Sequence, residues 1–220
     1  MSKQPPEVFY LPESYRIRYK NEHWNDVGQK EEWQLPTYLQ ASHVASVTGA
    51  KSVIDVGCGS AFKLLKYLGD LETTGVEVGP ALDHLRKAYP EGRRWEHGDW
   101  QADFGRFDLL ICSDVVEHLP DPRVLLSFIE RHEPYAVVIS TPVRGRKSGP
   151  PINRCHCMEW EPDEFYSFLT NGLKEYGFVF SIESGEENAA EGSLKSMVFT
   201  GIRGLPISRE NATISEIIKR

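Results

Sequence analysis

Long apolar runs, cysteine and positive charge are all scarce in this sequence of 220 residues. No stretch approaches the roughly 18 apolar residues of a membrane-spanning helix, and the first residues, MSKQPPEVFY, lack the apolar core of a signal peptide. The four cysteines are too few and too scattered for a small disulfide-bonded secreted domain. We therefore expect a cytoplasmic protein with reduced thiols and no membrane partner.

The shortage of positive charge limits the partners further. Lys and Arg total 25 against 32 for Asp and Glu, which gives a formal net charge of −7 and a sequence pI of about 5.6. This balance argues against broad contact with nucleic acid. The hydrophobic content of 40% is ordinary for a folded protein, and the length suits one sizeable domain.

The chain divides into three segments by its pattern. The first fifty residues are polar and aromatic with one predicted helix at 35–47, so we expect 1–50 to form a helical cap or lid. Residues 51–204 carry the regular pattern of the main domain, and 205–220 form an uninformative tail.

Within the main domain, short β-rich runs alternate with segments of helical periodicity. The predicted strands are SVIDV, TTGVEV, RRWEH, FDLLICS and YAVVIST, and the predicted helices are 61–68, 80–88, 121–131 and 162–176. This alternation predicts an α/β fold with a parallel sheet and crossover helices. Two further strands, at 178–182 and 196–202, are expected to form an antiparallel hairpin at one edge of the sheet.

The strongest local motif is VIDVGCGSAFKLL, in which a predicted strand ends at Asp55 and a Gly-x-Gly turn leads into a helix. Glycine at 57 and 59 lets the backbone turn tightly and approach a ligand without a Cβ in the way. Phe62 stands where the dinucleotide-binding fingerprint requires a third glycine, which disfavours NAD. The motif therefore predicts a different cofactor at this turn.

Acidic residues follow the next two predicted strands. Glu77 ends the second strand, where a carboxylate can accept hydrogen bonds from both hydroxyls of a ribose. Asp99 follows the third strand and can accept from an adenine amino group, while Trp100 can cover the ring. The alternative is that the glycines only form a turn, Glu77 is a solvated strand end and Trp100 belongs to the core.

Four motifs in succession, VIDVGCG, GVEVG, HGDW and FDLLICSDVVEHLPDP, resemble those of class I S-adenosylmethionine-dependent methyltransferases, in particular the small O- and N-methyltransferases that include ubiquinone-biosynthesis enzymes. The resemblance spans about 51–141 and continues more weakly to 180. It implies a Rossmann-like three-layer sandwich with a seven-stranded, mostly parallel sheet and one antiparallel strand. It also implies S-adenosylmethionine as cofactor, bound by Asp55, Gly57, Cys58, Gly59, Glu77, Val78, Asp99, Trp100, Ser113 and Asp114.

The candidate catalytic residues follow the fourth predicted strand. Methyl transfer from a sulfonium needs an aligned nucleophile and, for a hydroxyl acceptor, a base. His118 is the natural base, because imidazole titrates near neutral pH, with Glu117 beside it and His156 in NRCHCMEWEPDEF expected over the substrate pocket. The alternative is that Glu117 and His118 cap or pack the next helix.

Asp114, Glu117, His118 and His156 also suggest a divalent-metal site, similar to those of small-RNA 2′-O-methyltransferases, in which a cation positions a substrate oxygen. The RNA enzymes have glutamate where this chain has Asp114, so the reach to a shared ion is an open question. Zinc at Cys155, His156 and Cys157 is disfavoured, because adjacent ligands do not face one tetrahedral ion and no CxxC pair completes the set.

The leading hypothesis is methyl transfer to a small-molecule or saccharide-like hydroxyl, or to an amine. Aromatic residues of the cap and of the loop at 142–160 are expected to shape the acceptor site: Tyr15, Tyr19, Trp24, Trp33 and Trp160. A basic stretch at 144–147, with Arg154 beyond, either binds a phosphate or is a solvated loop. The alternatives are a metal-assisted RNA 2′-O-methyltransferase, which the overall acidity disfavours, and a non-catalytic subunit that binds the cofactor.

Overall fold

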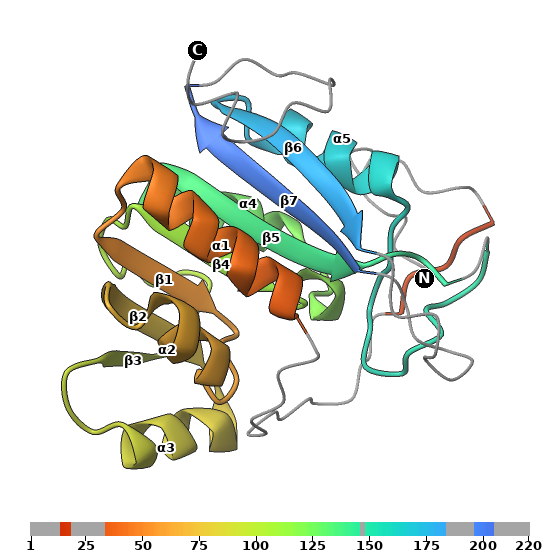
Figure 1. Cartoon of the computed structure of the whole chain (residues 1–220). Helices are drawn as coiled ribbons and strands as arrows, with labels where there is room; N and C mark the ends of the chain where they lie inside the picture. Colours follow the sequence, from red (N-terminus) through yellow and green to blue (C-terminus); the bar gives the residue numbers. More distant parts are fainter. Residues whose placement is uncertain (1–13, 19–33, 146–147, 184–195, 205–220) are drawn as a thin grey trace.

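A computed structural model describes residues 14–18, 34–145, 148–183 and 196–204 and shows a single seven-stranded sheet with helices on both faces (Figure 1). The strands follow the spatial order β3-β2-β1-β4-β5-β7-β6. They are β1 (Ser52–Val56), β2 (Glu72–Glu77), β3 (Arg94–His97), β4 (Leu109–Ser113), β5 (Ala136–Pro142), β6 (Tyr176–Glu183) and β7 (Ser196–Arg203). The helices are α1 (Leu35–Thr48), α2 (Phe62–Leu68), α3 (Gly79–Ala88), α4 (Arg123–His132) and α5 (Pro162–Gly172), with a short 3₁₀ turn η2 (Val116–His118).

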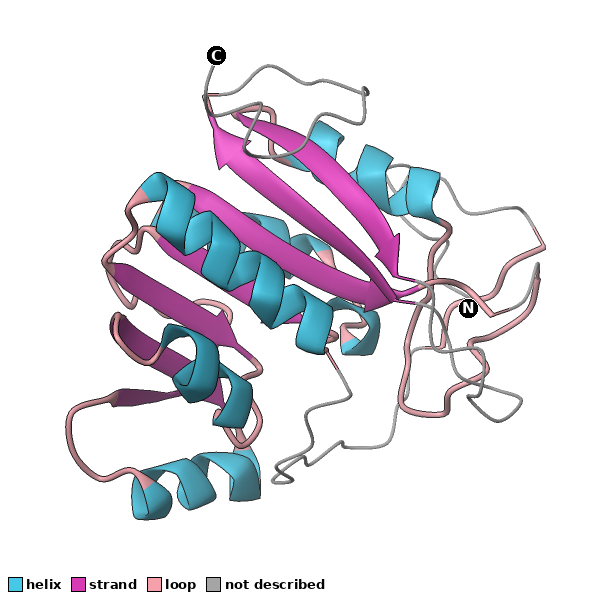
Figure 2. Cartoon of the chain, in the orientation of Figure 1, coloured by secondary structure: helices cyan, strands magenta, loops and turns pink. Residues whose placement is uncertain are grey.

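The sheet is parallel except around its last strand. β1 pairs in parallel with β2 and β4, β2 with β3, and β4 with β5. β7 runs antiparallel to both β5 and β6, between which it lies (Figure 2). The predicted seven-stranded, mostly parallel sheet with one antiparallel strand is thus confirmed. The two strands predicted to pair as a hairpin are β6 and β7. Of these, β6 forms the edge of the sheet and β7 lies inside it.

Two hydrophobic cores cover the two faces of the sheet, because successive side chains of a strand point to opposite sides. Val53 and Leu109 pack with α1, α2 and α3, whereas Ile54 and Leu110 pack with α4 and α5. Figure 1 shows α1 lying across one face, over β4 and β5. This gives the three-layer sandwich that places the carboxyl ends of β1, β2 and β4 along one edge, where open α/β sheets bind their ligands.

Most helices begin and end within two residues of their predicted bounds, but the last one was predicted too long. α5 ends at Gly172, whereas the prediction extended it to 176. Tyr176 instead starts β6, and its hydroxyl donates a hydrogen bond of 2.6 Å to the backbone oxygen of Pro134. This long-range contact overrides the helical periodicity of 173–176.

The predicted cap is described only in part. Helix α1 packs on the sheet, and residues 14–18 lie against the segment after β5, where the backbone nitrogen of Arg18 donates to the oxygen of Cys157 at 2.8 Å. Most of 1–33 and the tail at 205–220 lie outside the described residues, as do Tyr19, Trp24 and Trp33. Among the helices that are described, none combines the length and apolar character needed to cross a membrane.

Candidate functional site

The Gly-x-Gly turn after β1 has the backbone that its sequence predicts. Gly57 has φ 76° and Gly59 has φ 54°, a region that favours glycine. A Cβ on Gly57 would lie 2.3 Å from Cγ2 of Val115, so the loop after β4 closes directly over this turn. Residue 57 must therefore be glycine both for its conformation and for this close approach.

Glu77 ties the turn to the second strand. Its Oε2 accepts a hydrogen bond of 2.9 Å from the backbone nitrogen of Gly59, and its Oε1 accepts one of 2.8 Å from that of Val78. The carboxylate thus lies between the glycine turn and the start of α3. It is half-buried at the wall of a cavity, where its oxygens are placed to accept from a ligand as well.

A cavity of about 280 Å³ opens at the carboxyl ends of β1, β2 and β4. Its described lining residues are Val56, Gly57, Val76, Glu77, Val78, Gly98, Asp99, Trp100, Val115, His118, Leu119 and Phe128. Five of the residues expected to bind the cofactor are in this list. The apolar members would surround a ring, while Glu77 and Asp99 supply carboxylates.

Helix α4 fixes the segment that carries Asp99 and Trp100. The Arg131 guanidinium donates to the backbone oxygen of Trp100 at 2.8 Å, and the indole ring of Trp100 meets Phe128 edge to face at 5.5 Å. His132 is fully buried and accepts at Nε2 from the backbone nitrogen of Phe104 at 3.0 Å. Helix α4 therefore holds this wall of the cavity in place.

Asp55 is fully buried behind the cavity wall and is not among the lining residues described. The Tyr38 hydroxyl donates to its Oδ2 at 2.8 Å, while its Oδ1 has no hydrogen-bond partner in the described part of the chain. Burial raises the pKa of Asp55 to about 7, although the bond from Tyr38 works against that rise. Cys58 and Ser113, also expected to bind the cofactor through this edge, are buried too.

These features fit S-adenosylmethionine, the cofactor that the resemblance implies. Gly57 lines the cavity without a side chain, Glu77 and Asp99 stand where hydroxyls and an amino group can be recognised, and Asp55 keeps one buried oxygen without a donor among the described residues. The contribution of Asp55, Cys58 and Ser113 is limited to supporting the cavity from behind, because none of the three is in its described lining.

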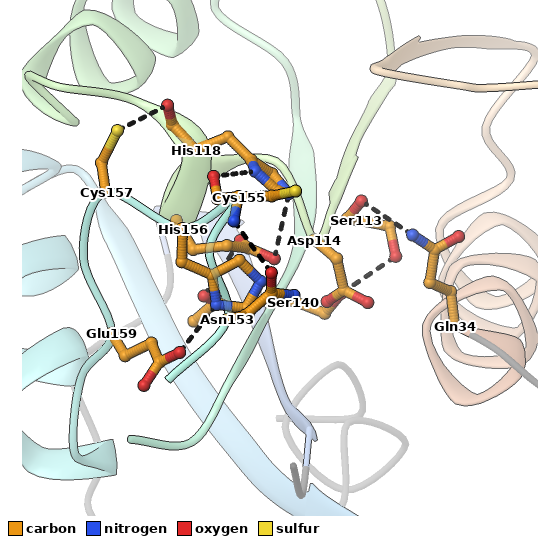
Figure 3. A network of polar contacts seen from close by, with 12 residues as sticks. Gln34, Ser113, Asp114, His118, Ser140, Asn153, Cys155, His156, Cys157 and Glu159 are labelled. Carbon is orange, nitrogen blue, oxygen red and sulfur yellow. Dashed lines mark hydrogen bonds and ion pairs between the residues drawn. The ribbon is translucent and has the colours of Figure 1, made fainter. Parts of the chain in front are cut away.

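Beyond the cavity, the end of β4 turns sharply at Asp114, which has φ 53° and is therefore strained for a residue other than glycine. The Ser140 hydroxyl donates to Asp114 Oδ1 at 2.7 Å, and Ser113 and Ser140 share a hydrogen bond of 2.9 Å (Figure 3). Burial raises the pKa of the Asp114 carboxyl. Asp114 thus points to β5 and is absent from the His–carboxylate cluster described next.

Three of the four residues predicted to share a metal do meet. One carboxylate oxygen of Glu117 and one ring nitrogen each of His118 and His156 lie within 4.8 Å of one another. Oε1 of Glu117 is 3.9 Å from Nε2 of His118. The imidazole rings of His118 and His156 lie edge to face, with their centroids 5.1 Å apart. This Glu–His–His cluster lies beside the cavity, because His118 belongs to both.

The cluster is held by short contacts between η2 and the segment after β5. Nδ1 of His118 bonds the backbone oxygen of Cys155 at 2.8 Å (Figure 3). The backbone nitrogen of Cys157 donates to the oxygen of Glu117 at 2.6 Å. A carbonyl oxygen only accepts, so neutral His118 carries its proton on Nδ1 and its lone pair on Nε2. Burial lowers the pKa of His118, which favours this neutral form.

Glu117 is almost completely buried. Its Oε2 accepts a hydrogen bond of 3.1 Å from the Thr141 hydroxyl, and burial raises the pKa of the carboxyl well above its ordinary value, with the charge of Asp114 adding to the rise. A carboxylate in such a place becomes easier to ionise when a cation binds beside it. The cluster can therefore either hold a divalent cation or act through His118 as a base.

The structure also adds residues that sequence reasoning missed. Tyr38, Ser140 and Thr141 contact predicted residues from other elements, and Glu159 contacts His156 from within the same segment. Only Glu159 offered a sequence clue, three residues after His156 in the same motif. The others are brought in by α1 and β5, whose register no local pattern specifies.

Other predicted contributors lie elsewhere. Trp160 is fully buried in the core and Tyr15 is nearly so, which leaves neither as an open wall of an acceptor pocket. Arg144 is buried, with Glu164 as its ion-pair partner and the Tyr15 ring 4.9 Å away. A phosphate-binding role for Arg144 is therefore not supported. Arg154 is exposed, and residues 146–147 lie outside the described part.

Comparison with known proteins gives a consistent picture. A family model described as a methyltransferase domain matches residues 37–170. The chain is also similar to proteins named ubiquinone biosynthesis O-methyltransferase from Coxiella burnetii, including strain RSA 493 / Nine Mile phase I, with 28% identity over 114 residues. That alignment covers 47% of this chain and 48% of the relative, so the chain spans about half the length of the curated relatives it matches.

Two solved structures illustrate the likeness in fold. The methyltransferase domain of bacterial CtHen1-C superposes with a TM-score of 0.56 and 23% identity, over 81% of this chain and 100% of that one. The plantazolicin methyltransferase BpumL in complex with SAH gives a TM-score of 0.56 and 14% identity, over 80% of this chain and 86% of that one. At these identities the superpositions establish a shared fold.

Proposed function

The chain belongs to the class I S-adenosylmethionine-dependent methyltransferases, and we propose that it transfers the methyl group to a hydroxyl oxygen of a small-molecule or saccharide-like acceptor. The observation that carries this proposal is that His118 belongs both to the cavity and to the cluster. This imidazole lines the cavity that fits the cofactor and also belongs to the Glu–His–His cluster. A hydroxyl bound there would lie between the methyl donor and a base.

At the cofactor end, Gly57 and Gly59 give the methionine portion access to the backbone, and Glu77 accepts from the ribose. Asp99 accepts from the adenine amino group, and Trp100 and Phe128 enclose the ring. S-adenosylmethionine supplies a methyl group on a sulfonium that departs as a neutral thioether. The chain is therefore required to orient the acceptor and to receive its proton.

At the acceptor end, His118 receives that proton on Nε2, because the Cys155 oxygen keeps the other ring nitrogen protonated. The lowered pKa keeps the ring neutral and competent as a base near neutral pH. The name of the Coxiella relatives, an O-methyltransferase, supports oxygen rather than nitrogen as the methylated atom. An acceptor amine remains the second form of the same proposal.

A metal-assisted mechanism is the second candidate, and the Glu–His–His cluster favours it. Imidazole nitrogens and one carboxylate are a ligand set typical of a divalent transition metal or Zn²⁺ with an open position for substrate. A cation held there would polarise the acceptor oxygen, including a 2′-hydroxyl of RNA. The net charge of −7 weighs against RNA and toward a small acceptor.

The decisive experiment is calorimetric titration of the protein with S-adenosylhomocysteine, followed by a methyl-transfer assay with hydroxylated and amine acceptors, each with EDTA and with added Mg²⁺ or Mn²⁺. Micromolar binding together with transfer to a hydroxyl would support the proposal. Transfer abolished by EDTA and restored by Mn²⁺ would select the metal-assisted form. Binding without transfer to any acceptor would favour a non-catalytic subunit, and absence of binding would overturn the cofactor assignment.

A further inference from the structure

Glu159 is a buried carboxylate that contacts the Glu–His–His cluster through one member. Its Oε1 lies 2.8 Å from Nδ1 of His156, and both side chains are at most 5% exposed. Among the residues that the structure describes, the one donor to its Oε2 is the backbone nitrogen of Gly145, at the long distance of 3.4 Å. The imidazole is therefore the strongest partner described for a carboxylate that burial would otherwise leave poorly compensated.

The backbone of Glu159 is held independently of its side chain. Its nitrogen donates to the Tyr15 hydroxyl at 2.8 Å, a contact across 144 residues of sequence. The backbone nitrogens of Cys157 and Met158, just before it, donate to the oxygen of Glu117 at 2.6 and 3.1 Å. The carboxylate is thus fixed relative to both η2 and the N-terminal segment.

The consequence is chemical, because a carboxylate that accepts from Nδ1 decides which nitrogen of an imidazole carries the proton. Glu159 selects the form of His156 with hydrogen on Nδ1 and the lone pair on Nε2. The Cys155 oxygen imposes the same form on His118. Two imidazoles from separate segments are therefore set in the same tautomer within one cluster, and Figure 3 shows the contacts to Cys155 and Glu159 that impose it.

We propose that Glu159 is a positioning residue of the acceptor site, which orients His156 and fixes its tautomer so that Nε2 serves the cluster. This inference rests on the proposed function, in which the cluster acts on the acceptor hydroxyl. It applies whether His156 accepts a proton or binds a cation, because both need an unprotonated Nε2. A buried ion pair that served stability alone would need neither the tautomer nor the neighbouring histidine.

The test combines Glu159→Gln with His156→Asn. Gln keeps the shape but can donate as well as accept, so it no longer selects one tautomer. Asn keeps an N–H that can bond Glu159 but places no atom where Nε2 of the histidine lies. The ¹⁵N-histidine NMR signals that disappear in this variant are thereby assigned to His156. Glu161→Gln is the matched control, since Glu161 lies two residues away and is 49% exposed in its side chain.

In the unmodified protein we expect the NMR spectra to show His156 protonated on Nδ1. In Glu159→Gln a mixture of tautomers is expected, with kcat lowered roughly 10- to 100-fold, and with binding of S-adenosylhomocysteine within about twofold. His156→Asn should lower kcat at least as much, and Glu161→Gln should change none of these quantities. A rise in KM or a fall in Tm alone, with kcat intact, would indicate a structural role and overturn the proposal.

The tautomer measurement does not depend on turnover, so the two proposals fail separately. If the protein neither binds S-adenosylhomocysteine nor transfers methyl groups, the proposed function is wrong while the His156 tautomer still tests Glu159. If the unmodified protein shows His156 protonated on Nε2, the role of Glu159 is wrong whatever the activity. Should Glu159→Gln fail to fold, Tyr15→Phe removes the acceptor for the backbone of Glu159 and must shift the same His156 signals.

Discussion

The cofactor end and the acceptor end of the site differ in how far apart their residues lie in the sequence. Gly59 and Glu77 follow or end consecutive strands and are joined by a hydrogen bond across 18 residues. At the acceptor end, His118 is fixed by a backbone oxygen 37 residues away, and Glu159 by a tyrosine 144 residues away. One end is encoded by local motifs, whereas the other exists only once distant segments have met.

This difference separates two kinds of requirement. The cofactor end demands backbone conformations, such as φ 76° at Gly57, that one substitution destroys. The acceptor end demands protonation states, which depend on which partner faces each ring nitrogen. Substitutions at the first end should therefore alter affinity for the cofactor, and substitutions at the second should alter turnover.

The largest effect is expected at Gly57. Gly57→Ala places a Cβ 2.3 Å from Val115 Cγ2, and a β-branched side chain has little freedom to move away. We expect affinity for S-adenosylhomocysteine to fall roughly 100-fold, or about 3 kcal/mol, as measured by calorimetry. Gly92→Ala is the control, because Gly92 has a similar φ of 73° with open space around it. Val115→Ala added to Gly57→Ala should recover much of the loss, and failure to do so would contradict the steric explanation.

At the acceptor end, His118→Asn should separate turnover from binding. Asn keeps a donor for the Cys155 oxygen but lacks Nε2, so the segment should stay in place while the base is lost. We expect turnover to fall roughly 100-fold or more, with affinity for S-adenosylhomocysteine nearly unchanged. Initial rates of methyl transfer measure the first and calorimetry the second. Unchanged turnover would place the base elsewhere.

A smaller effect is expected from Glu77→Gln, which keeps the shape of the side chain and removes its charge. Charge-assisted hydrogen bonds contribute about 1–3 kcal/mol, so affinity for S-adenosylhomocysteine should fall by that amount. Glu96→Gln, at the end of the neighbouring strand and partnered by Arg94, should leave affinity unchanged. If both substitutions had the same small effect, Glu77 would not bind the ribose.

The smallest effect concerns stability and pH at Asp55. Its pKa of about 7 in the folded state exceeds the unfolded value, so the folded protein binds this proton more tightly and loses stability as pH rises from about 4 to about 7. Between pH 5 and pH 7 this contribution is roughly 1–2 kcal/mol in the free energy of unfolding. Asp55→Asn, which can still accept from Tyr38, should flatten that slope in denaturant titrations. An identical slope in both proteins would contradict the raised pKa.

The fold was largely predictable from short-range patterns, and half of the residues predicted for the cofactor end line the described cavity, while their role stays a prediction. Alternating strand and helix periods gave the parallel sheet, and Gly57, Glu77 and Asp99 were located by their places at strand ends. The acceptor end was predicted only as a set of residue types. Asp114 turns to Ser140 rather than to the cluster, since its backbone at φ 53° redirects the side chain.

The contacts of Tyr38 and Thr141 with site residues could not be predicted from the local sequence. Tyr38 reaches Asp55 because α1 lies across the sheet, and nothing in the periodicity of 35–47 marks that position. The same holds for Thr141, which meets Glu117 through the pairing of β4 with β5. Such contacts depend on tertiary packing, which a single sequence does not display.

The place of β7 has a consequence for the order in which the molecule assembles. β7 is the last strand of the sheet in sequence, yet it fills the gap between β5 and β6. Domains generally fold as units, and on the ribosome the residues of β1 to β5 emerge before 196–203, so the sheet is completed only after β7 has been made. During that interval the open edge of β5 is an unpaired strand edge, exposed to pairing with other chains. Nascent chains of this protein should therefore be most prone to aggregation between the synthesis of β5 and that of β7.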